Sequence, residues 1–188
     1  MELTNETVAF ENEEQLQKVR KKKQRNKIVI GVIVASVIVI VGALFLLFRN
    51  LLSERDPISL EAFTHVLEEN DFEIYDLGYR FQEGPGSDAV VVYFGATDGS
   101  TEFEFLELVN VQEARNLFEN IRSGWEHGRG SSSSQSFVSG VNFDVYRLTT
   151  GGLYREILRV EHIVIIGVGE QANRGNIQDL FSDFENHD

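Results

Sequence analysis

Residues 28–48 read IVIGVIVASVIVIVGALFLLF, a run of 21 residues without a single charged side chain. At about 1.5 Å of rise per residue, a helix of this length covers roughly 31 Å, close to the hydrocarbon thickness of a bilayer. A buried core helix rarely needs so long an uninterrupted apolar run. The stretch therefore predicts a transmembrane helix that separates a short N-terminal tail from a larger C-terminal part.

Seven basic residues stand directly before the apolar run, and only Arg49 and Arg55 follow it closely. Because basic residues stay on the cytoplasmic side, we expect the N-terminus inside and the C-terminal bulk outside. Clustered basic side chains are also suited to contact with anionic lipids. The cluster consists of Lys18, Arg20, Lys21, Lys22, Lys23, Arg25 and Lys27.

The apolar run is longer than the core of a cleaved signal peptide, which has about 7–15 residues, and no A-x-A cleavage site follows it. It is therefore expected to be an uncleaved signal anchor. The absence of cysteine excludes anchoring through a lipid-modified cysteine. The expected organisation is an acidic and then polybasic cytoplasmic tail at 1–27, the anchor at 28–48, a linker at 49–57 and an extracytoplasmic domain at 58–188.

The C-terminal part is strongly acidic. Residues 51–188 hold 25 acidic residues and nine arginines, which gives 25 − 9, a net charge of −16, and all five lysines lie in 18–27. Such a surface repels nucleic acid and is compatible with a basic protein partner. Without cysteine, an exported domain must be stabilised by its core alone, which favours a bacterial plasma membrane as its location.

The pattern of the C-terminal part predicts a helix, three strands, a helix, four strands and a last helix. Ser59 is expected to cap a helix over 60–69 and Asn110 a second helix, while Asn176 is expected to cap the last. Because tight turns join the strands, they should be antiparallel. The fold class is therefore α+β, with helices packed on a mostly antiparallel sheet in the order α-βββ-α-ββββ-α.

Expected strands lie at 72–77, 89–96, 101–108, 136–139, 142–149, 153–160 and 163–168, and Ser131–Ser134 are expected to form a flexible loop. Centring the first clear hairpin on the favoured turn pair Asp98-Gly99 places Phe94 opposite Phe103. The type of turn and the apolar alternation agree on this hairpin.

Centring a second hairpin on Gly151-Gly152 places Arg147 opposite Glu156 and Arg159 opposite Asp144. Those arginines are then expected to form cross-strand ion pairs, each contributing about 0.2–1 kcal/mol, instead of an anion site. Arg155, opposite Leu148, is left without a charged partner.

No catalytic, cofactor-binding or metal-binding residue is predicted. Residues 167–172 match G-x-G-x-x-A, but the chain ends before the second parallel strand of a dinucleotide site, so a turn is expected there. His65, His127, His162 and His187 lack metal-ligand spacing. Trp125 is expected to pack in the core more than to anchor a ligand.

The sequence favours a non-enzymatic binding or interaction module held at the membrane, with a protein partner outside. One alternative is an envelope hydrolase, which needs two carboxylates buried together in a cleft, at least one with a raised pKa. Another is an accessory subunit of a membrane complex, assembled partly through small residues of the transmembrane helix. Those residues are Gly31, Ala35, Ser36, Gly42 and Ala43.

Overall fold

A computed structural model describes residues 36–43, 45, 53–81 and 87–186. The chain forms two compact units, 1–50 and 51–188. In the first unit, residues 36–43 are helical. Within the described ranges no helix has the length and apolar character needed to cross a bilayer. Most of the predicted anchor, the whole basic cluster and His187 lie outside the described residues.

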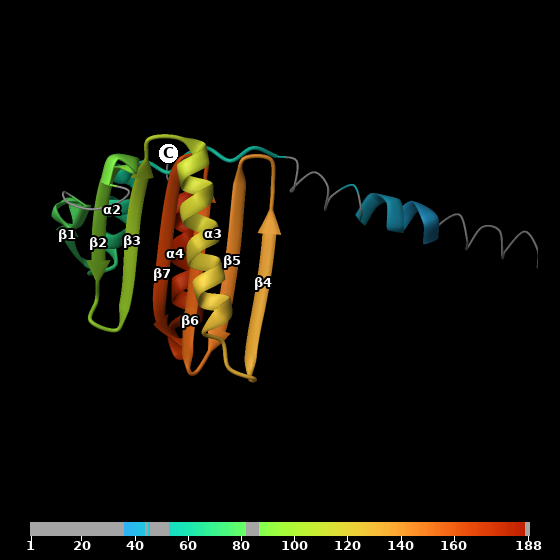
Figure 1. The fold of residues 1–188 in the computed structure, drawn as a ribbon. Coiled ribbons are helices and arrows are strands. Elements are labelled where there is room, and N and C mark those ends of the chain that lie inside the picture. Colours follow the sequence, from blue (N-terminus) through green and yellow to red (C-terminus); the bar gives the residue numbers. More distant parts are fainter. Residues whose placement is uncertain (1–35, 44, 46–52, 82–86, 187–188) are drawn as a thin grey trace, which may run out of the picture. The chain divides into compact units, whose positions relative to one another are not determined.

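The second unit is built on a seven-stranded antiparallel sheet with the strand order β1-β2-β3-β7-β6-β5-β4 (Figure 1). The α+β class and the antiparallel sheet are therefore confirmed, and the elements follow one another in the predicted order. The strands are β1 (Glu73–Asp76), β2 (Val90–Thr97), β3 (Thr101–Leu108), β4 (Ser133–Ser139), β5 (Phe143–Thr150), β6 (Leu153–Val160) and β7 (Ile163–Glu170).

Three helices cover the sheet: α2 (Leu60–Glu69), α3 (Val111–His127) and α4 (Arg174–Asn186). Short 3-10 helices η1 (Gly78–Phe81) and η2 (Ser87–Ala89) lie between β1 and β2, and η3 (Gln171–Asn173) lies between β7 and α4. Two of the three predicted caps are present, since the Ser59 side chain accepts a bond from the Ala62 N–H and the Asn110 side chain one from the Glu113 N–H. Each cap satisfies a backbone donor that has no partner within the helix.

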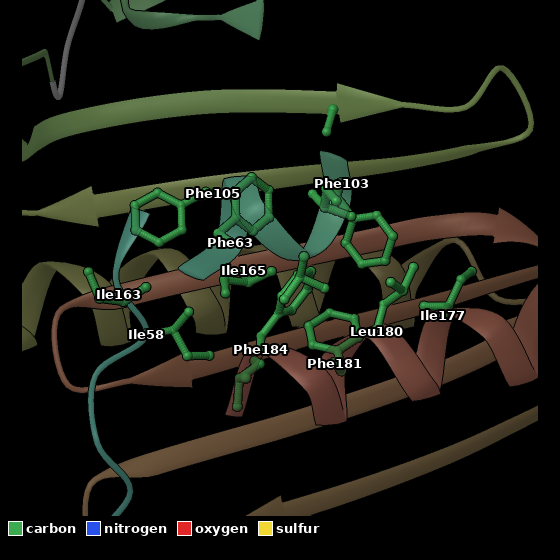
Figure 2. Packing of buried hydrophobic residues seen from close by; sticks show 14 of the residues in the cluster. Ile58, Phe63, Phe103, Phe105, Ile163, Ile165, Ile177, Leu180, Phe181 and Phe184 are labelled. Atoms are coloured by element: carbon green, nitrogen blue, oxygen red, sulfur yellow. The ribbon is translucent and has the colours of Figure 1, made fainter. Parts of the chain in front are cut away.

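The helices divide into two layers, with α2 and α4 on one face of the sheet and α3 on the other, and an apolar core fills each interface. Phenylalanines dominate the core under α2 and α4, and Figure 2 shows them converging from both helices and from β3. Burying one such side chain contributes about 1.5–3 kcal/mol. The labelled members are Ile58, Phe63, Phe103, Phe105, Ile163, Ile165, Ile177, Leu180, Phe181 and Phe184.

The register predicted for the first hairpin is wrong by two residues. Phe94 lies opposite Phe105 instead of Phe103, because the turn is centred one position later than Asp98-Gly99. The Asp98 Oδ1 atom accepts the N–H groups of Ser100 at 2.8 Å and Thr101 at 2.7 Å. This side-chain turn, with Gly99 at φ 87°, fixes the connection. A shift of two residues keeps every side chain on its predicted face.

Two predicted boundaries also differ from the structure. Ser133 and Ser134 are in β4 instead of a loop, because they pair with Thr150 and Thr149. The last helix, α4, begins at Arg174 instead of after Asn176, since η3 leads directly into it. Its predicted buried face is confirmed, with Ile177 and Leu180 almost fully buried.

The predicted turn at G-x-G-x-x-A is also wrong, because Gly167 and Gly169 belong to β7. A Cβ atom at Gly167 would lie 2.9 Å from both Phe103 and Phe181, and one at Gly169 would lie 3.0 Å from Ile177. Real Cβ atoms essentially never come as close as the first distance, and the second is tighter than most real contacts. The two glycines therefore let α4 approach the sheet closely, which is a packing role.

Candidate functional site

A charged cluster lies where α4 crosses β5 and β6, and it consists of Arg55, Arg147, Tyr154, Glu156 and Glu185. The predicted register of the Gly151-Gly152 hairpin is confirmed, and it places Arg147 opposite Glu156. Both Nε and Nη2 of Arg147 lie 2.7 Å from Glu156 Oε1, and the Tyr154 hydroxyl donates to Oε2 at 2.5 Å. The Glu156 side chain is only 1% exposed. Its carboxylate is therefore buried with both oxygens occupied.

Arg55 brings the segment before α2 into this cluster. Its guanidinium pairs with Glu185 and stacks 3.7 Å above the centre of the Phe143 ring. Its backbone is held as well, because its N–H donates to Asn142 Oδ1 at 2.9 Å and its carbonyl accepts from Asn142 Nδ2 at 2.7 Å. The chain just before the domain is thus attached to the end of the sheet by four contacts.

The pKa values of three groups in this cluster are shifted. Burial raises the pKa of the Glu185 carboxyl and the charge of Glu156 raises it further, while Arg55 and Arg147 oppose the shift. Burial also raises the pKa of Tyr154, and its hydrogen bond to Glu156 adds to this. The pKa of Arg147 is raised although burial acts to lower it, because its hydrogen bond to Glu156 and the charge of that carboxylate outweigh burial.

The cavity beside these groups is small, about 60 Å³, and polar and apolar side chains line it together. This is room for a few water molecules, whereas pockets for small-molecule ligands span about 300–1,000 Å³. Each glutamate also has its own arginine partner. Glu156 is therefore a buried carboxylate, but Glu185, whose pKa is raised, has a side chain that is 33% exposed. The cavity beside them is also too small for a substrate.

The second predicted ion pair is also formed, with Arg159 Nε 2.7 Å from Asp144 Oδ2. The Arg159 side chain is only 1% exposed, so the pair is largely buried. The guanidinium donates further to the carbonyl oxygens of Asn142 and Glu161, and Ser139 donates to Asp144. A buried arginine needs such a complete set of acceptors, so this group stabilises the end of the sheet.

Arg155 has an aromatic partner, since its guanidinium lies 5.8 Å from the Trp125 ring centre. Trp125 in turn lies 6.3 Å from Tyr146 and packs against the core under α3. The predicted packing role of this tryptophan is therefore confirmed. Arg147 and Arg159 are thus each paired with a carboxylate, while Arg155 contacts an aromatic ring.

The three histidines in the described part of the chain have separate partners. His65 lies 3.6 Å from Glu69, His162 lies 3.7 Å from Glu107, and His127 Nδ1 lies 2.6 Å from the Ser123 carbonyl oxygen. Across residues 36–43, 45, 53–81 and 87–186, no group of three histidine or acidic side chains is arranged to hold a metal ion.

The open edge of the sheet at β4 is the feature that suits binding best. The strand pairs with β5 on one side, and no described strand pairs with its other side (Figure 1). Its residues, SSQSFVS, carry no charge, and neither does any residue from 130 to 143. Phe137 is 48% exposed. Unpaired backbone groups on an uncharged strand are a ready template for another strand.

Sequence reasoning did not find Glu185, Arg55 or the open edge. Glu185 and Arg55 are 130 positions apart, and only the docking of α4 brings them together. The uncharged run 130–143 was the available signal for the edge, since it interrupts a chain in which 25% of residues are charged.

Comparison with known proteins gives little further guidance. No protein-family model matches the chain, and no curated protein matches it significantly. Among solved structures, a GTP-binding regulator from Thermotoga maritima matches with a TM-score of 0.44 and 15% identity, over 70% of this chain and 93% of that one. A likeness at this level carries no functional argument.

Proposed function

We propose that this chain is a single-pass membrane protein whose acidic extracytoplasmic domain is a non-enzymatic binding module. The open, uncharged β4 edge carries the proposal, because it offers backbone donors and acceptors to an extended partner segment. In this function the domain recognises a protein outside the cell, and the anchor keeps it at the plasma membrane with the N-terminus inside.

The anchor is supported by sequence and by exposure. Residues 28–48 contain no charge and follow seven basic residues. The apolar side chains of residues 37–41 are 52–70% exposed, an apolar surface that lipid would cover. Contact of the basic cluster with anionic lipid headgroups is part of the same proposal.

The test is affinity capture of the intact protein from its membrane after crosslinking, with a variant lacking residues 55–188 as the control. We expect a partner that is lost with the deletion. A partner retained by the truncated form would overturn the proposal in favour of a membrane-complex subunit assembled through the helix.

An envelope hydrolase is the second candidate, and the raised pKa of Glu185 beside Glu156 is the observation that favours it. The arginine partner of each carboxylate and the cavity of about 60 Å³ count against it. Glu185→Gln separates the two functions. If the chain is a binding module, this variant should still capture its partner. If the chain is a hydrolase, the variant should lose turnover of its substrate, and no captured protein is expected.

A further inference from the structure

We propose that β4 pairs with β4 of a second copy of this chain, which joins two seven-stranded sheets into one antiparallel sheet across a two-fold axis at Ser136. This inference names the partner of the proposed binding module. The inference rests on the proposed function because it requires both copies to be anchored in the same membrane.

The phase of the β4 ladder determines which groups are available. The Gly140 N–H donates to the Phe143 carbonyl at 2.8 Å, so this pair is hydrogen-bonded towards β5. Bonded and non-bonded pairs alternate in an antiparallel ladder. The backbone groups of Ser133, Gln135, Phe137 and Ser139 therefore point away from β5, towards the open edge.

Two copies of β4 match one another in a single full-length register. Ser133 opposes Ser139 of the partner and Gln135 opposes Phe137 of the partner, so that every outward-pointing residue is in a hydrogen-bonded pair. Ser136 lies on the axis opposite itself, in a non-hydrogen-bonded pair. No charge meets a like charge, because the strand has none.

Phe137 supplies an apolar contact at the same place. It is 48% exposed, although it lies 6.2 Å from Phe118 and beneath the Arg122 guanidinium. In the paired sheet the two Phe137 side chains become diagonal neighbours on one face, about 7–8 Å apart and within reach of each other. Pairing therefore covers an aromatic side chain that the single copy leaves half exposed.

The charge distribution permits a second copy as the partner. Residues 51–188 have a net charge of −16, yet residues 130–143 carry no charge. Two acidic domains can approach here because the repelling charges lie elsewhere and are screened beyond about 8 Å at physiological salt. One strand pair buries less than the roughly 1,200 Å² of a stable interface, and a shared membrane supplies the missing effective concentration.

The chain has no cysteine, so a single introduced cysteine reports the register without background. In the full-length protein in its membrane, Ser136→Cys should form an intermolecular disulfide under mild oxidation. The two Cα atoms of a non-hydrogen-bonded pair lie about 4.5 Å apart, within disulfide range.

Ser134→Cys is the matched control. Its two copies would be offset by four residues, about 14 Å along the strands, and should crosslink about tenfold less. Equal crosslinking of the two variants would mean collision without register and would overturn the proposal. Equal melting temperatures of both reduced variants and the wild type establish that each is folded.

A second measurement does not need a disulfide. Ser136→Lys places two lysines opposite each other, while Ser136→Thr keeps the pair neutral and suits a strand. We expect the dimer fraction, counted by single-molecule photobleaching in membranes, to fall several-fold with lysine and to persist with threonine. An adduct of Ser136→Cys with a different protein would overturn the second copy as the occupant and leave the proposed binding function standing.

Discussion

At the scale of single residues, the close approach of α4 to the sheet depends on Gly167. Its missing side chain is what lets Phe103 and Phe181 meet over β7, because a Cβ atom would lie 2.9 Å from each ring. Both rings belong to the core under α2 and α4, so neither can move without disturbing its neighbours.

We expect Gly167→Ala to destabilise the domain by about 1–3 kcal/mol, the usual cost of overpacking a core. Gly124→Ala is the matched control, because nothing lies within 4 Å of its added Cβ atom. In the last turn of α3 that change should stabilise by up to about 0.5–1 kcal/mol. Thermal unfolding should show a lower melting temperature for Gly167→Ala and a higher one for Gly124→Ala. An unchanged melting temperature for Gly167→Ala would contradict the packing role.

Glu185 gives the domain a dependence on pH with a definite sign. Burial raises the pKa of this carboxyl above its ordinary value of 4.5, so the folded state holds the proton more tightly than the unfolded chain. Its contribution to stability is fully present below pH 4.5 and is lost as the pH rises through the raised value.

Glu185→Gln removes this titration. The difference in melting temperature between variant and wild type should stay constant below pH 4.5 and then move in favour of the variant as the pH rises. A series of thermal unfolding curves across the acidic range measures it. Parallel profiles for the two proteins would show that Glu185 does not titrate differently on folding.

At the scale of elements, the two hairpins differ in how well local sequence determines their register. The Gly151-Gly152 hairpin was predicted correctly because two opposite-charge pairs, Arg147 with Glu156 and Asp144 with Arg159, agree with the turn. The β2–β3 hairpin has no such pairs. There the hydrogen bonds of the Asp98 side chain decide the turn, and apolar alternation cannot distinguish registers two residues apart.

Contacts between distant elements were beyond sequence reasoning. Ser133 and Ser134 look like a flexible linker by composition and become a strand because β5 supplies Thr150 and Thr149 as partners. The burial of Glu156 likewise depends on α4 lying over β6. The periodicity of apolar residues identified the elements and the fold class. It does not show which charged side chains become buried when a helix packs on the sheet.

Proline substitution tests the ladder phase of β4. Ser134 is in a pair bonded to β5, so Ser134→Pro should lose that bond and cost about 1–3 kcal/mol. Ser133 points its N–H to the open edge, where proline is tolerated, so Ser133→Pro should change the melting temperature little. Thermal unfolding compares the two, and the reverse order would invert the assignment of outward-facing residues.

At the scale of the whole molecule, the proposed anchor would take its orientation in the membrane from the asymmetry of basic residues. Seven of them lie at 18–27, while residues 51–188 have a net charge of −16. In the proposed orientation the strongly acidic domain would lie outside, away from anionic headgroups and free for partners.

Replacing the lysines at 18, 21, 22, 23 and 27 by glutamate should therefore reverse or mix the orientation. In sealed vesicles with the cytoplasmic face inward, added protease should digest the domain of the wild type and spare a large part of it in the variant. The matched control replaces the same five lysines by arginine and should behave as the wild type. Identical digestion of all three proteins would contradict the proposed anchor.

The two edges of the sheet are chemically unlike, and this bears on how large an assembly can grow. The edge at β1 is four residues long and carries Glu73 and Asp76, whereas the edge at β4 is seven residues long and uncharged. Addition at β4 alone is self-limiting, since each copy then presents only its short acidic edge. A filament grows only if each copy has two sheet edges that can pair with another copy. The acidic residues of β1 make the second edge of this chain unsuitable, so assembly should stop at the dimer.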